Sequence, residues 1–142
     1  WVKLLGNICF NPTSVLTDGT VASMATHPQL RESILKPLIN EAVCVAQSMG
    51  IDTSEFPSAD ERIEKVRANQ HPPSMLQDFR VGRPLEIDSI LGQVHAFGKS
   101  LGVATPTLTI VMTLVQAATD FQSKILEHGG HSQESNCKRQ RC

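Results

Sequence analysis

The chain has 142 residues, with 13 basic against 14 acidic side chains and a formal net charge of −1. Its 40% hydrophobic content excludes a disordered polyelectrolyte, and a charge so close to zero argues against sequence-independent binding to nucleic acid. The length predicts one domain, or part of a longer chain, that buries a core of its own.

No stretch of the sequence is long and apolar enough to cross a bilayer. The best candidate, Leu108 to Val115, is far shorter than the ~20 residues that a membrane-spanning helix needs. The first residues also lack the basic segment and the long apolar stretch of a signal peptide. We therefore expect a cytoplasmic protein with neither a membrane nor a nucleic acid as its partner.

The first predicted element is a helix, because the apolar helical pattern begins with the opening residues WVKLL. No capping residue precedes this helix, although the first four backbone N–H groups of a helix need partners. We interpret it as a helix entered midway, and we expect the natural chain to continue upstream of Trp1. Pro12 should bend the helix locally, because it leaves the carbonyl of Ile8 without its helical donor.

A second helix is predicted to start at Thr26 and Pro28 and to reach Met49, where Gly50 supplies a left-handed stop. Pro37 should kink this helix, because proline lacks a backbone donor and its ring clashes with the preceding turn.

Two capping boxes predict the next two helices. Ser58 with Glu61 three residues later opens a short charged helix that ends at about Asn69, and Ser74 with Gln77 repeats the pattern for the helix that follows.

The last two helices are predicted over residues 86–101 and 106–127. Gly102 stops the first, and Thr105 with the proline after it caps the second. Strand signals are scarce, so the sequence predicts an all-α, bundle-like fold.

Two organisational predictions complete this description. The helical domain is expected over residues 1–127, and the polar residues 128–142 are expected to form a disordered tail.

The four cysteines show neither a C-x-x-C pair nor a metal-ligand spacing, which predicts reduced thiols and no metal site. Of these four, Cys9 and Cys44 are expected to act as small apolar side chains of the core.

Polar side chains in the first eleven residues are confined to Lys3, Asn7 and Asn11. Spaced i, i+4 and i+8, they are offset by about 40° at each step around a helix and form one narrow row. A solvent-facing helix normally has polar residues over about half of its circumference. We therefore expect the row to line a small cleft, where an ammonium and two amides suit a polar molecule that carries a carbonyl or carboxylate. A surface strip, or amides bonded to neighbouring helices, are the alternatives.

The segment SMLQDFRVGRPLEID holds a second group of candidate residues. Ser74 can act as a helix cap, and Glu86 as a first-turn acid that the helix dipole favours. Arg80 and Arg83 can be surface cations or partners of the nearby aspartates. Each of these structural roles is sufficient by itself to explain the residue.

Taken together, the segments WVKLLGNICFNPTSVL, SMLQDFRVGRPLEID and LGVATPT resemble the C-terminal domain of ketopantoate reductase (2-dehydropantoate 2-reductase). The resemblance covers about residues 1–127. This family reduces 2-dehydropantoate to pantoate with NADPH, a step in pantothenate and coenzyme A biosynthesis. Its members join an N-terminal dinucleotide-binding domain that carries G-x-G-x-x-G to an all-helical domain like that of 6-phosphogluconate dehydrogenase-like reductases. No G-x-G-x-x-G is found in this chain, so the resemblance implies that the missing N-terminal domain mainly holds NADPH.

The resemblance also implies a role for each candidate residue. Lys3 matches the catalytic lysine that protonates the carbonyl oxygen as hydride arrives, and an ammonium stabilises the developing alkoxide. Asn7 and Asn11 match amides that contact the substrate. Ser74 matches the serine that binds the substrate carboxylate, and Glu86 the catalytic acid that hydrogen-bonds the substrate hydroxyl.

Two departures from the family pattern leave the identity of the 2-keto acid open. His71 stands where the family often has an asparagine, and a second family asparagine has no clear counterpart near Asp18 to Val21. The leading hypothesis is the substrate-binding, proton-donating half of the reductase, with negligible turnover alone. The alternatives are a reductase for another branched 2-keto acid and a non-catalytic helical module that serves in dimerisation. We expect a possible homodimer under each hypothesis. In the isolated chain, the apolar helix surfaces lack the large apolar domain that would cover them, and such surfaces favour self-association.

Overall fold

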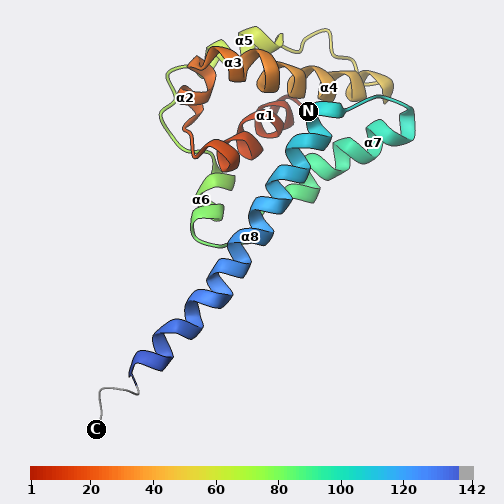
Figure 1. The fold of residues 1–142 in the computed structure, drawn as a ribbon. Coiled ribbons are helices and arrows are strands. Elements are labelled where there is room, and N and C mark those ends of the chain that lie inside the picture. The colour runs from red at the N-terminus through yellow and green to blue at the C-terminus, as the bar shows by residue number, and fades with distance from the viewer. Residues whose placement is uncertain (138–142) are drawn as a thin grey trace.

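The computed structural model of the chain describes residues 1–137, with side chains up to residue 125. Helices and no strand are found among the described residues, so the predicted all-α fold is confirmed (Figure 1). The elements in chain order are α1 (Val2–Thr17), α2 (Val21–Thr26), α3 (Pro28–Leu30), η1 (Arg31–Leu35), α4 (Lys36–Ser48), α5 (Ala59–Lys65), α6 (Ser74–Arg80), η2 (Asp88–Gly92), α7 (Gln93–Leu101) and α8 (Pro106–Cys137).

Helix α1 is the central element of the domain. It packs against α4, α6 and α8, which surround it in Figure 1. Every residue from Ile8 to Val15 is buried. A helix that is covered on all sides must be apolar on nearly all sides, which explains why polar residues in its first turns are confined to one narrow row.

The helix predicted from Thr26 and Pro28 begins at Pro28, and its cap lies one residue later than predicted. Thr26 ends the separate helix α2, and the prediction of Thr26 as a cap is wrong. His27 is the cap of α3 instead, because its Nδ1 accepts a hydrogen bond from the backbone N–H of Leu30 at 3.2 Å. An imidazole nitrogen can accept such a bond as a hydroxyl oxygen does.

Pro37 is accommodated by a π-helical turn, η1, directly before it. The N–H of Lys36 donates to the carbonyl of Arg31, five residues earlier. A π turn widens the helix, so the proline ring avoids the carbonyl that it would meet in a regular α-helix. From Pro28 the backbone continues as helix to Ser48.

The capping box of Ser58 and Glu61 at the start of α5 is confirmed. The helix ends at Lys65, however, and not near Asn69 as predicted. The loop after it has another use, because the carbonyls of Asn69 and His71 accept hydrogen bonds from the first N–H groups of α2, at 2.7 and 3.3 Å. The loop that follows α5 thus pairs with the start of α2.

The start of α8 is capped by a residue of α4. The carboxylate of Glu41 accepts hydrogen bonds from the N–H groups of Thr107 and Leu108, both at 2.9 Å. The predicted cap, Thr105, has its hydroxyl 3.2 Å from Nδ1 of His95 instead. A carboxylate at a helix N-terminus is favoured both by the free N–H groups and by the helix dipole.

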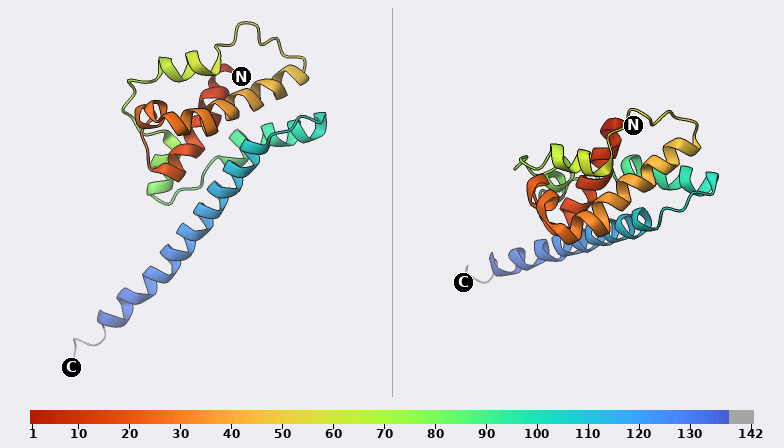
Figure 2. Two further views of the ribbon diagram at one scale, coloured as in Figure 1. Left: turned by 45° about the horizontal axis from the view of Figure 1, so that its top comes forward. Right: turned by 90° about the horizontal axis from the view of Figure 1, so that it is seen from above.

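Helix α8 continues beyond its predicted end. It reaches Cys137, passing through Gly129 and Gly130. Each glycine costs a helix about 1 kcal/mol relative to alanine, which does not forbid helix formation. The predicted disordered tail falls outside the described residues over 138–142. The far half of α8 extends away from the other helices in each view (Figures 1 and 2). Within the described part of the chain, no helix combines the length and apolar character needed to span a membrane.

The two cysteines predicted for the core differ in their environments. Cys9 is fully buried, and this burial raises the pKa of its thiol to about 12, against an opposing effect of the nearby Arg62. The prediction for Cys44 is wrong, because its side chain is exposed. The buried face of α4 runs through Leu38, Ala42 and Val45, and position 44 lies outside that stripe.

Candidate functional site

Three of the five predicted site residues meet at one small hollow between α1, α6 and the segment before η2. The hollow has a volume of about 10 Å³, which is room for a single water molecule. Its lining residues come from three separate parts of the chain: Asn11, Ser74, Met75, Asp78, Glu86 and Ile90.

Lys3 and Asn7 lie outside this lining, on the same face of α1 as Asn11. A rise of 1.5 Å per residue places their backbones about 12 and 6 Å from that of Asn11 along the helix. The side chains become more buried from the start of the row to its end. Lys3 is exposed, Asn7 is half-buried and Asn11 is buried. Lys3 makes no hydrogen bond or ion pair with any described residue. The polar row therefore leads from the surface into the hollow, with a free ammonium at its outer end.

The predicted capping role of Ser74 is wrong. The N-cap of α6 is Pro73, which makes no side-chain hydrogen bond, and Ser74 is the first residue of the helix. The other half of the expected capping box, Gln77, donates its side-chain N–H to the carbonyl of Pro72 at 2.9 Å. Because the Ser74 hydroxyl has no hydrogen bond to the described residues, it remains available to a ligand.

The position of α6, which carries Ser74, is set by contacts at its far end. The guanidinium of Arg80 donates from Nε and Nη2 to one oxygen of Asp18, at 3.0 and 2.7 Å. Asp18 ends α1 in the left-handed backbone conformation, with φ 53°. Gln122 of α8 also donates to the carbonyl of Phe79 at 2.6 Å. Contacts with the end of α1 and with α8 thus hold α6 in place.

Two carboxylates face the hollow, and they differ in their partners. Asp78 forms an ion pair with Arg83 at 3.3 Å, which is one of the pairings that the sequence suggested. Glu86 forms no ion pair with a described residue. Because Arg83 offsets the charge of Asp78, the carboxylate of Glu86 is the acid left to interact with a ligand.

Sequence reasoning missed Arg62 of α5. Its Nη1 donates to the carbonyl of Val2 at 2.8 Å, in the turn of α1 that carries Lys3. Its Nε and Nη2 are buried without a hydrogen-bond partner among the described residues. The only signal in the sequence was a basic residue in the last turn of a charged helix, which is unspecific.

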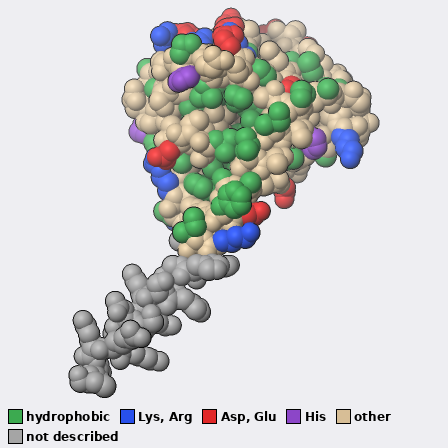
Figure 3. Space-filling view, viewed as in Figure 1, with side chains coloured by type: hydrophobic (Ala, Val, Ile, Leu, Met, Phe, Trp, Pro, Cys, Tyr) green, Lys and Arg blue, Asp and Glu red, His purple; other side chains and the backbone are tan. Residues whose placement is uncertain are grey.

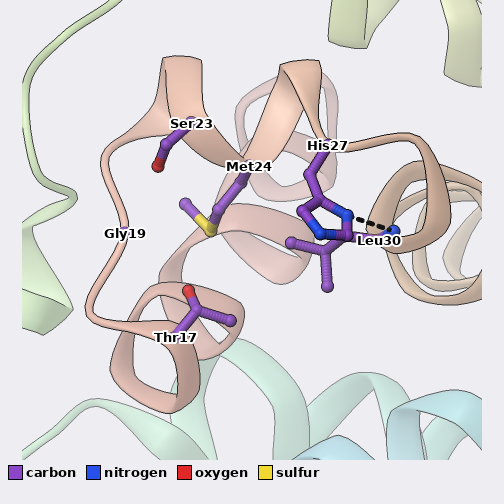
Figure 4. Close-up of a pocket in the computed structure, with 6 residues that line it drawn as sticks. All are labelled: Thr17, Gly19, Ser23, Met24, His27 and Leu30. Carbon is purple, nitrogen blue, oxygen red and sulfur yellow. Dashed lines mark hydrogen bonds between the residues drawn. The ribbon is translucent and has the colours of Figure 1, made fainter.

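A larger cavity, of about 330 Å³, lies between the end of α1, α2 and α3 (Figure 4). It contains none of the predicted site residues. The hydroxyls of Thr17 and Ser23 donate to backbone carbonyls of their own segments, and the dashed line in Figure 4 marks the His27–Leu30 bond. Its lining includes no carboxylate, lysine or arginine. The lining residues are Thr17, Gly19, Ser23, Met24, His27 and Leu30.

Comparison with known proteins agrees with the fold and with the motifs. Residues 1–119 match the family model of the ketopantoate reductase PanE/ApbA C terminal. The chain belongs to this family. The 2-dehydropantoate 2-reductase of Mesorhizobium japonicum is 37% identical over 118 residues, which make up 82% of this chain and 35% of that protein. The chain thus spans about a third of the length of this curated relative.

Solved structures of a 2-dehydropantoate 2-reductase and of a D-mandelate dehydrogenase share the fold. The 2-dehydropantoate 2-reductase of Geobacter metallireducens GS-15 aligns with a TM-score of 0.75 and 30% identity, over 83% of this chain and 40% of that one. A D-mandelate dehydrogenase, solved with NADH and anilino(oxo)acetate, aligns with a TM-score of 0.75 and 27% identity, over 86% and 51%.

Proposed function

We propose that the chain is the substrate-binding and proton-donating domain of an NADPH-dependent 2-dehydropantoate 2-reductase. One observation carries the proposal. In a chain of the ketopantoate reductase family, Asn11, Ser74 and Glu86 line the same hollow although up to 75 residues separate them. The exposed ammonium of Lys3 lies on the same helix face as Asn11.

Lys3 is the proton donor in this proposal. NADPH, when bound, supplies the hydride that attacks the carbonyl carbon. The oxygen then gains negative charge, and an ammonium beside it stabilises that charge and transfers a proton to it. A lysine without an intramolecular ion pair suits this role, because its charge is not already offset by a carboxylate.

The remaining residues bind and orient the keto acid. The Ser74 hydroxyl donates to the substrate carboxylate, and the Glu86 carboxylate accepts a hydrogen bond from the substrate hydroxyl. Asn7 and Asn11 can each donate and accept, so they suit the polar groups between these two ends. The hollow holds about one water molecule, so a keto acid must bind across its mouth, toward Asn7 and Lys3.

The residues of this chain fit the substrate side of the reaction better than the dinucleotide side. The described residues form no strand, whereas dinucleotide-binding folds are built on parallel strands joined by helices. We therefore expect the dinucleotide to be held by a domain outside this sequence, and turnover by the chain alone to be negligible.

A second candidate function is the reduction of another 2-keto acid. The similarity to a D-mandelate dehydrogenase favours it, as does His71 in a position where the family often has an asparagine. The side chain of His71 is exposed, and the imidazole differs from an amide in shape and in its hydrogen-bonding groups.

Calorimetric titration of the chain with pantoate and with mandelate tests the proposal. We expect heat of binding from pantoate, and a weaker signal after Ser74→Ala, because this change removes the hydroxyl that binds the carboxylate. Ser100→Ala is the matched control, since Ser100 is exposed and its hydroxyl bonds only within α7. A signal from mandelate alone would favour the second candidate. Binding that is the same in the Ser74→Ala variant would contradict the assignment of this site.

A further inference from the structure

The hollow proposed to bind a keto acid is lined by two carboxylates, those of Asp78 and Glu86. Asp78 follows Ser74 by four residues on α6, so their Cβ atoms lie about 6 Å apart on one face of the helix. Charges of the same sign repel one another at such distances, even in partly aqueous surroundings. A substrate carboxylate bound at Ser74 therefore requires a cation that offsets the charge of Asp78.

The described part of the face shown in Figure 3 has no broad basic surface that could supply this cation, because its lysine and arginine side chains are scattered. The formal net charge of the chain is −1. Arg80, on the same helix as Asp78, donates from Nε and Nη2 to Asp18, so its charge is already offset. The compensating charge must therefore come from a residue that is held close to Asp78 itself.

The turn that ends α6 brings a cation back to Asp78. The N–H of Gly82 donates to the carbonyl of Phe79 at 3.0 Å, and the N–H of Arg83 donates to the carbonyl of Asp78 at 2.9 Å. These two bonds form a Schellman motif, in which Gly82 takes the left-handed φ of 69°. Nη1 of Arg83 also lies 3.3 Å from a carboxylate oxygen of Asp78. The backbone and the side chain of Arg83 thus both pair with Asp78, so the fold of the turn places its charge.

We propose that Arg83 enables the site to accept an anionic keto acid, by offsetting the charge of Asp78 and without touching the substrate. The inference rests on the proposed function, because it requires that Ser74 binds the substrate carboxylate. Without Arg83, that carboxylate would face two uncompensated carboxylates, those of Asp78 and Glu86. The side chains of Arg83 and Asp78 are 72% and 37% exposed, so the effect on binding should be moderate and should weaken with added salt.

Calorimetric titration with pantoate at low ionic strength tests the role of this charge. We expect Arg83→Gln to raise the dissociation constant about 2- to 5-fold, and Arg83→Lys, which keeps the charge, to raise it less. The double variant Asp78→Asn/Arg83→Gln also lacks the carboxylate that needs compensation, so its affinity should return to near that of the original chain. Arg67→Gln is the matched control, since Arg67 is exposed and pairs with Glu64 at 3.1 Å, outside the lining of the hollow. This variant should bind pantoate like the original chain.

Added salt separates this electrostatic role from a purely structural one. The Debye length is about 30 Å in 0.01 M salt and about 3 Å in 1 M salt, so the difference between the original chain and the Arg83→Gln variant should largely disappear in 1 M salt. A loss of affinity that persists in 1 M salt, or that the added Asp78→Asn change does not reverse, would overturn the proposal, because an altered turn would then explain it.

The same titrations distinguish failure of this inference from failure of the proposed function. If the original chain binds pantoate and Arg83→Gln binds it equally well at low ionic strength, this inference alone is overturned. If the original chain binds no pantoate, the proposed function is overturned together with it.

Discussion

The two long helices of this domain, α1 and α8, have different surroundings, and different residues in them carry the information about function. Helix α1 is enclosed by three neighbours, so its apolar residues report only on packing. The polar residues of α1 carry the information about function, because polar side chains are unusual in an enclosed helix. Along α8 the situation is reversed. There the unexpected feature is a set of large apolar side chains that are 50–71% exposed, those of Ile110, Leu114, Phe121 and Ile125.

The largest expected effect concerns the polar row of α1. Replacing Lys3 by alanine in the intact two-domain reductase should lower kcat about 10²- to 10⁴-fold, because the developing alkoxide loses its proton donor. Loss of absorbance by the reduced nicotinamide during ketopantoate reduction measures this rate. The control is Lys99→Ala, at an exposed lysine of α7. An intact rate in the Lys3→Ala enzyme would leave the row with a structural role only.

A matched pair of leucines sharpens the comparison of packing. Leu5 of α1 is 0% exposed and Leu114 of α8 is 50% exposed. We expect Leu5→Ala to lower the free energy of unfolding by about 2–5 kcal/mol, and Leu114→Ala to change it by less than about 0.5 kcal/mol. Denaturant unfolding of the two variants measures both changes. Equal losses would mean that the two helices are enclosed to the same degree.

Two helical glycines provide a smaller test of how closely the helices approach. A Cβ at Gly98 would lie 3.0 Å from Thr105 Cγ2 and 3.2 Å from the Val103 carbonyl oxygen, whereas at Gly6 nothing lies within 4 Å. Gly98→Val should cost about 1–3 kcal/mol of stability through overpacking. Gly6→Ala should instead stabilise α1 by up to about 1 kcal/mol. Thermal unfolding of the two variants gives the sign of each change in stability. A Gly98→Val variant as stable as the original chain would show that the neighbouring residues can move apart.

The smallest expected effect is a dependence of stability on pH, through an exposed ion-pair cluster that joins η1 and α4 to α5. Lys36 lies 2.6 Å from Glu32 and 2.8 Å from Asp60. The hydrogen bond from Lys36 lowers the pKa of Asp60, and the hydrogen bond to Asp60, followed by that to Glu32, raises the pKa of Lys36.

The signs of these two shifts define a pH window. The contribution of Asp60 is complete above its unfolded pKa of 3.8 and is lost as the pH falls through its lower folded pKa. That of Lys36 is complete below its unfolded pKa of 10.5 and is lost as the pH rises through its higher folded pKa. Stability should therefore be flat between these limits and decline at both ends. Urea midpoints across the pH range measure it, and Asp60→Asn should reduce the decline on the acid side. An unchanged acid limb in that variant would exclude this pair as its source.

Local signals in the sequence predicted several features correctly. The left-handed stop at Gly102 and the capping box of Ser58 and Glu61 were predicted from neighbouring residues alone, and both are confirmed. The polar row of α1 likewise follows from helical periodicity. Such features depend on residues within about four positions of one another, so the local sequence is sufficient to specify them.

Other features were decided only by the tertiary structure. The cap of α8 is Glu41, which lies more than sixty residues earlier in the chain. Ser74, whose sequence suggests a cap, has its hydroxyl left free because Pro73 occupies the N-cap position of α6. Cys44 was predicted to be buried and is exposed. In each case the outcome depends on which distant element packs against the residue, and residue spacing carries no information about that contact.

The amino-acid sequence by itself determined the helical class, most of the helix boundaries and the row formed by Lys3, Asn7 and Asn11, because backbone hydrogen bonding and side-chain periodicity are local. The tertiary structure decided that Ser74 and Glu86 join Asn11 at one hollow, and that one face of α8 remains uncovered. Both depend on how helices pack across long sequence separations, where burial of the whole core, and not any single motif, selects the arrangement.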